Sequence, residues 1–126
     1  MPSYKLDHIH LNSPDPLKTA EFYEKVLGAK RVSIGDIPGG RTIVDLDING
    51  LTIKVTHPRA KPASFMTDYG LDHFGLITDD LEKAVGEFKA KGVKFVQEIT
   101  EIRPGVKISF FLSPENVWVE LVERKG

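Results

Sequence analysis

The sequence predicts an α+β protein made of two tandem βαβββ modules with mixed sheets. A six-residue segment beginning at Leu6, Leu-Asp-His-Ile-His-Leu, returns at Leu71 as Leu-Asp-His-Phe-Gly-Leu, 65 residues later. Each copy continues through a short acidic turn into an amphipathic stretch that ends in a glycine, Gly28 or Gly92. Such a long period in 126 residues indicates two copies of one supersecondary unit. Predicted strands outnumber helices and hairpins dominate, which is typical of α+β folds.

The first module is expected over residues 4–57. Period-2 alternation predicts a half-buried opening strand that places His8 and His10 on one face. Asp15 is suited to cap the following helix, Pro16 suits its first turn, and Asn49-Gly50 is a strong hairpin signal. The expected elements are a strand at Lys5–Asn12, a helix from Pro16 to Gly28, and strands at Lys30–Ile34, Arg41–Ile48 and Leu51–Thr56.

The second module is expected over residues 71–123, after a linker at 58–70 that is rich in proline, small residues and charges. The expected elements are a strand at Leu71–Ile77, a helix at Leu81–Lys91, and strands at Lys94–Thr100, Lys107–Leu112 and Val117–Glu123. The length of the chain suits one compact domain over residues 1–126.

Composition excludes several classes of protein. Seventeen basic and eighteen acidic residues give a net charge of −1, so no overall field attracts nucleic acid or an anionic membrane. No apolar run approaches the roughly 20 residues of a membrane span. The N-terminus lacks the apolar core of a signal peptide, so we expect a cytoplasmic protein. Cysteine is absent, which leaves histidine and carboxylate as metal ligands.

The candidate site lies on the strand faces that we expect to turn away from the helices. Two histidines at equivalent repeat positions, His8 and His73, together with Glu120 in the last strand form a candidate metal triad. Such ligands suit Fe²⁺, Mn²⁺, Zn²⁺, Ni²⁺ or Co²⁺ and leave positions open for substrate. Histidines hydrogen-bonded within the core are the alternative, which the repeat symmetry and Glu120 disfavour. The side chains expected on these faces are His8, His10, Asp45, Lys54, His73, Trp118 and Glu120.

Four segments carry a resemblance to a known family: Leu6-Asp7-His8-Ile9, Phe22 to Gly28, Leu71-Asp72-His73 and Val117 to Leu121. With them the chain resembles the vicinal oxygen chelate superfamily, which includes glyoxalase I, methylmalonyl-CoA epimerase, extradiol dioxygenases and bleomycin-resistance proteins. The resemblance implies a cup-shaped mixed sheet. It also implies a divalent metal held by His8, His73 and Glu120, which chelates two neighbouring oxygens of a small organic substrate.

One position departs from part of that family. Glyoxalase I and the epimerases have a fourth ligand, Glu or Gln, in the last strand of the first module. When the two modules are aligned, this position is Lys54, the equivalent of Glu120 in the second module. An ammonium group cannot bind a cation, so the pattern favours a three-ligand site. Lys54 is then expected either to neutralise a substrate anion or to pair with Asp45 across the hairpin. His10, one pleat from His8, is the candidate general acid/base or, alternatively, a histidine packed beside the site.

These features favour a metal-dependent enzyme. Ring cleavage of the extradiol dioxygenase type with Fe²⁺ is slightly preferred over a glyoxalase I-like lyase or an epimerase. The competing class is a non-catalytic drug- or metabolite-binding protein of the bleomycin-resistance type. The family resemblance also implies a homodimer. Trp118, Phe111 and Tyr69 are candidates for lining a substrate pocket, although aromatic residues in strands more often serve ordinary packing.

Overall fold

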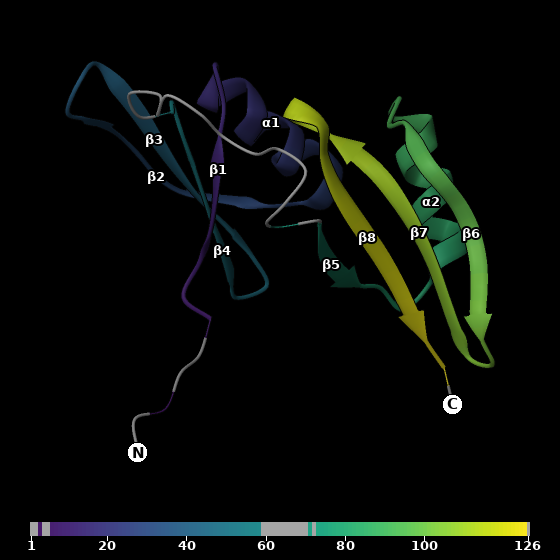
Figure 1. Cartoon of the computed structure of the whole chain (residues 1–126). Coiled ribbons are helices and arrows are strands. Elements are labelled where there is room, and N and C mark those ends of the chain that lie inside the picture. Colours follow the sequence, from purple (N-terminus) through teal and green to yellow (C-terminus); the bar gives the residue numbers. More distant parts are fainter. Residues whose placement is uncertain (1–2, 4–5, 59–70, 72, 126) are drawn as a thin grey trace. The chain divides into compact units, whose positions relative to one another are not determined.

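The structure is a computed structural model that describes residues 3, 6–58, 71 and 73–125. The chain forms two compact units, within residues 1–63 and 64–126 (Figure 1). Each unit has one helix and one four-stranded mixed sheet, which confirms the predicted pair of βαβββ modules. No helix in the described part of the chain has the length and apolar character needed to cross a membrane.

The first unit packs its helix on the apolar face of its sheet. The sheet order is β1-β4-β3-β2, with β1 parallel to β4 and the other pairs antiparallel. Residues of β3 and β4 that alternate toward the helix, such as Val44 and Ile53, are completely buried, as the period-2 pattern predicts. The elements are β1 Ile9–Asn12, α1 Pro16–Leu27, β2 Lys30–Ile37, β3 Arg41–Ile48 and β4 Leu51–Thr56.

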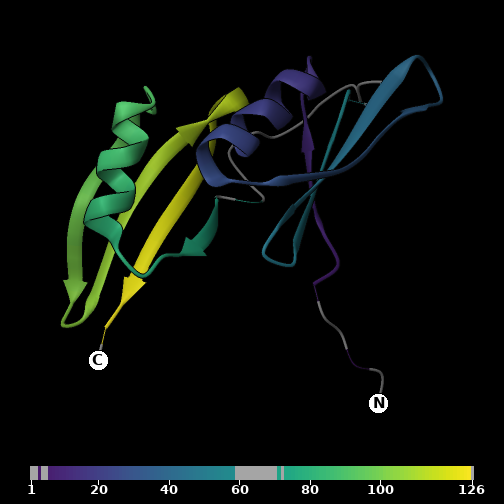
Figure 2. The same ribbon diagram turned by 180° about the vertical axis from the view of Figure 1, so that it is seen from behind.

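The second unit repeats this plan. Its sheet order is β5-β8-β7-β6, with β5 parallel to β8, and α2 packs on β6, β7 and β8 (Figure 2). Phe88 of α2 meets Phe111 of β7 edge to face, with 5.2 Å between the ring centroids. The elements are β5 Phe74–Ile77, α2 Leu81–Ala90, β6 Phe95–Arg103, β7 Val106–Ser113, the 3-10 turn η1 Pro114–Asn116 and β8 Val117–Arg124.

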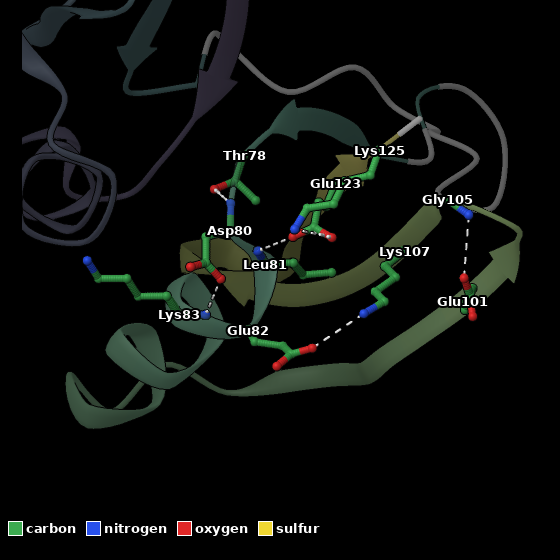
Figure 3. Close-up of polar contacts among 10 residues, drawn as sticks. All are labelled: Thr78, Asp80, Leu81, Glu82, Lys83, Glu101, Gly105, Lys107, Glu123 and Lys125. Atoms are coloured by element: carbon green, nitrogen blue, oxygen red, sulfur yellow. Dashed lines mark hydrogen bonds and ion pairs between the residues drawn. The ribbon is translucent and has the colours of Figure 1, made fainter.

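Local signals in the sequence place the helix ends and the hairpin. The Asp15 and Asp80 side chains accept hydrogen bonds from Lys18 N and Lys83 N, so each aspartate caps its helix. Figure 3 shows a second contact at the start of α2, where the buried Glu123 of β8 accepts a 2.9 Å hydrogen bond from Leu81 N. This carboxylate satisfies a backbone N–H that the helix itself cannot pair. It therefore ties the start of α2 to β8.

Several predicted boundaries were wrong. The first strand of each module begins later than predicted, at Ile9 and Phe74, so His8 and His73 precede their strands. The second strand runs past Ile34 to Ile37, because Gly35 and Asp36 also pair with β3, at Ile43 and Thr42. β6 likewise continues to Arg103. From residue 59 onward the expected linker lies outside the described residues, as do Tyr69 and Asp72.

Candidate functional site

The predicted ligands of the second unit, His73 and Glu120, lie side by side. Glu120 is on the face of β8 that turns away from α2, because its neighbours Val119 and Leu121 are buried against the helix. His73 Nε2 donates a 3.1 Å hydrogen bond to Glu120 Oε1, and the two side chains are 29% and 19% exposed. Two ligands about 2.1 Å from one ion, at right angles, are about 3.0 Å apart. The 3.1 Å hydrogen bond is therefore also a separation at which these two groups could serve as adjacent ligands of one divalent metal.

The absence of a side chain at Gly75 leaves room for this pair. Gly75 of β5 lies opposite Glu120 of β8, and a Cβ added there would be 3.4 Å from Glu120 Oε1. The equivalent position in the first unit is His10, which lies opposite Lys54. The two copies of the repeat thus differ at this position: the strand partner of Glu120 is a glycine, whereas the strand partner of Lys54 is a histidine.

Two aromatic side chains flank the His73–Glu120 pair. Phe110 of β7, which pairs with Glu120, lies edge to face with the His73 ring, with centroids 4.9 Å apart. Its ring is 5.9 Å from that of Trp118, a residue that is 44% exposed. Phe111 serves ordinary packing and does not line a pocket, because it points to the helix side and is completely buried. Strand alternation shows why: Phe110, which sequence reasoning missed, shares the face of Glu120.

In the first unit, the His8 side chain is hydrogen-bonded to that of the preceding residue, Asp7. His8 Nδ1 donates a 2.8 Å hydrogen bond to Asp7 Oδ2, and the Asp7 side chain is almost wholly exposed. Histidines that bind metals commonly donate their second ring N–H to a carboxylate, which fixes the tautomer and leaves the other nitrogen for the metal. The contact therefore suits His8 to act as a ligand through Nε2.

Two polar pairs lie on the face of the first sheet that turns away from α1. Lys54 Nζ forms a 2.9 Å ion pair with Asp45 Oδ2 across β3 and β4, so the cross-hairpin pairing considered from the sequence is present. A 2.7 Å hydrogen bond joins His10 Nε2 and Thr56 Oγ1. Asp45 Oδ1 is buried and has no hydrogen-bond partner among the described groups. Lys54 thus presents a tethered ammonium group beside an imidazole.

The structure brings together some of the predicted site residues. His73 and Glu120 meet within the second unit, while His8, His10 and Lys54 belong to the first. Within the described residues, no group of three or more His, Asp or Glu side chains is gathered for a metal. The complete triad of His8, His73 and Glu120 therefore stays a prediction. His57, which follows β4 and is half-buried, accepts a 2.9 Å hydrogen bond from Thr42 N.

The tandem βαβββ fold indicates the class of protein. A family model described as the Glyoxalase/Bleomycin resistance protein/Dioxygenase superfamily matches residues 5–121. The chain belongs to this superfamily, which confirms the resemblance seen in the sequence.

Among curated proteins, the relatives include metabolic enzymes. A lactoylglutathione lyase of Schizosaccharomyces pombe is 27% identical over 98% of the chain and 46% of its own length. The chain thus spans about half of that relative. The human mitochondrial methylmalonyl-CoA epimerase is 29% identical over 94% of the chain and 72% of its own length.

Solved structures share the fold. A glyoxalase family protein from Enterococcus faecalis has a TM-score of 0.79 at 20% identity, over 94% of this chain and 97% of that one. The fosfomycin resistance protein FosX of Listeria monocytogenes, in complex with Mn(II) and sulfate, has a TM-score of 0.74 at 19% identity. The match covers 99% of this chain and 95% of that one. These relatives give no support to the slight preference for extradiol ring cleavage, whereas the lyase or epimerase alternative agrees with the curated names.

Proposed function

We propose that this chain is a metal-dependent lyase or isomerase acting on a small molecule that presents two neighbouring oxygens. The observation that carries the proposal is the His73–Glu120 pair, whose 3.1 Å separation suits two ligands of one ion. Membership of a superfamily with relatives named as a lyase and an epimerase supports the reaction class. Ring cleavage is set aside, and with it the preference for Fe²⁺, which depended on dioxygen chemistry.

In this proposal His8, His73 and Glu120 hold the divalent metal, whether Mn²⁺, Ni²⁺, Zn²⁺, Co²⁺ or Fe²⁺. The metal supplies Lewis acidity toward the substrate oxygens. His10 moves a proton at the neighbouring carbon, because imidazole exchanges protons near neutral pH. Thr56 orients His10 through their 2.7 Å hydrogen bond. Lys54, tethered by Asp45, places a fixed positive charge where negative charge collects on the substrate.

The test follows proton exchange, which both named reaction types share. The metal-reconstituted protein is incubated in D₂O with S-lactoylglutathione or methylmalonyl-CoA, and loss of the proton next to the carbonyl is followed by NMR. We expect exchange with one of the two compounds, and His10→Gln should slow it at least about 100-fold, the usual contribution of a general acid/base. His57→Gln is the matched control, because His57 bonds the backbone at Thr42.

Two results would decide against the proposed chemistry. Exchange that is equally fast in the protein treated with chelator would remove the metal from the mechanism. Tight binding of either compound without exchange would instead favour a metabolite-binding protein. The homodimer stays part of the proposal, and light scattering tests it against the chain mass of 14.1 kDa.

A further inference from the structure

The face of the second sheet that carries His73 and Glu120 has an aromatic side that the proposed chemistry does not use. Phe110 contacts the His73 ring edge to face at 4.9 Å, and the Trp118 ring is 5.9 Å from Phe110. We call Phe110 and Trp118 the aromatic wall. It adjoins the donor pair directly, so any ligand on His73 and Glu120 is within reach of it.

The fold does not require aromatic residues at these positions. Lys54 and Glu120 are equivalent in the two modules, and the strand register then makes Asp45 equivalent to Phe110 and Thr52 equivalent to Trp118. The first unit forms the same sheet with a carboxylate and a hydroxyl where the second has rings. Core packing also does not explain them, because Trp118 is 44% exposed and Phe110 is only partly buried.

We propose that the aromatic wall binds a planar or extended apolar substituent of the substrate, next to the oxygens that face His73 and Glu120. The substrate class is then a compound with two adjacent oxygens and an apolar group one or two bonds away. Trp118 and Glu120 are two residues apart on one strand face, a separation of about 6.5 Å that a phenyl ring attached to the chelating group spans. This inference rests on the proposed function for its metal.

Hydroxamates provide the test, because they bind divalent metals through two adjacent oxygens. Benzohydroxamate and acetohydroxamate share the chelating group and differ in a phenyl against a methyl group. We expect the Ni²⁺-loaded protein to bind benzohydroxamate about tenfold to fiftyfold more tightly, since the ring removes apolar surface from water against the wall. Calorimetry measures both affinities, and their ratio cancels any change in the affinity for the metal itself.

Variants decide whether the wall causes that preference. Phe110→Leu and Trp118→Leu should each lower the ratio at least threefold, and the double variant should bring it close to one. Phe22→Leu is the matched control, because Phe22 is another partly buried phenylalanine, on α1 of the first unit. Equal affinities for the two hydroxamates, or a preference that the double variant retains, would overturn the inference.

A second readout separates this inference from the proposed function. Trp118 is the only tryptophan of the chain, so its fluorescence reports on the wall directly. In protein without metal, millimolar benzohydroxamate should still change the Trp118 emission, acetohydroxamate should not, and Phe110→Leu should abolish the change. If the chain binds no metal but this response is present, the proposed function is wrong and the inference that the aromatic wall binds an apolar group is still supported. If the response is absent, the inference that the aromatic wall binds an apolar group is refuted.

Discussion

Replacing Gly75 with alanine should weaken metal binding without weakening the fold. The new methyl group would lie 3.4 Å from Glu120 Oε1 and 3.7 Å from Glu120 Cβ. At that separation the methyl group makes a van der Waals contact with the carboxylate, covers one side of it and restricts its movement toward a metal ion. Changes beside metal ligands typically cost 10- to 100-fold in affinity, and we expect the lower end, about tenfold, or about 1.4 kcal/mol.

The fold should tolerate the same change. The backbone at Gly75 is not in the left-handed region, and glycine in a strand is about 0.5–1 kcal/mol less stable than alanine. We therefore expect the free energy of unfolding of the metal-free protein to stay the same or to rise by up to about 1 kcal/mol.

Calorimetric titration with Ni²⁺ and urea unfolding of the metal-free protein measure the two quantities separately. Gly86→Ala in α2 is the control, because a Cβ there meets nothing within 4 Å. It should raise stability by about 1 kcal/mol and leave the affinity for Ni²⁺ unchanged. The reasoning is refuted if Gly75→Ala binds Ni²⁺ within twofold of the wild type, or if its affinity falls only together with its stability.

Further substitutions test the supporting contacts. Glu123→Ala should cost about 1–3 kcal/mol in urea unfolding, because Leu81 N loses its 2.9 Å acceptor in a buried position; wild-type stability would show that the bond contributes nothing. Asp15→Ala removes a helix cap and should lower the free energy of unfolding by about 1 kcal/mol. An unchanged unfolding midpoint would contradict this. Lys54→Met should cost about 1–2 kcal/mol by leaving the Asp45 carboxylate without its partner. It should also leave the Ni²⁺ stoichiometry unchanged, and a lost metal ion would show that Lys54 supports the ligands.

Much of the fold could be predicted from the sequence, because the signals for helix starts, hairpins and buried strand faces are local. Alternation placed Val44 and Ile53 in the core, Asp15 marked a helix start, and Asn49-Gly50 adopted the positive φ angles of a tight hairpin. Strand ends were less accessible. Gly35 is a common turn residue, yet it pairs with Ile43, because hydrogen bonding to the neighbouring strand outweighs the local preference.

The candidate site could be predicted only in part, because it depends on which side chains meet across strands. The repeat singled out His73, and alternation placed Glu120 on the open face. Their contact could not be predicted, because it depends on where the segment before β5 places the His73 side chain. Phe110 was missed because the sequence has two adjacent phenylalanines, and only the register of β7 decides which one faces Glu120. The role of Gly75 had no signal of its own, since it consists of the room left for a neighbouring carboxylate.

Metal binding by His8, His73 and Glu120 is best tested by titrating Ni²⁺ into the wild type and into the variants His8→Ala, His73→Ala and Glu120→Gln. The titration gives the stoichiometry and the affinity, and circular dichroism checks the fold. We expect one ion per chain in the wild type. Each variant should bind at least about 100-fold more weakly, with unchanged secondary structure. A wild type that binds no ion, or three variants that each keep the full affinity, would contradict this expectation.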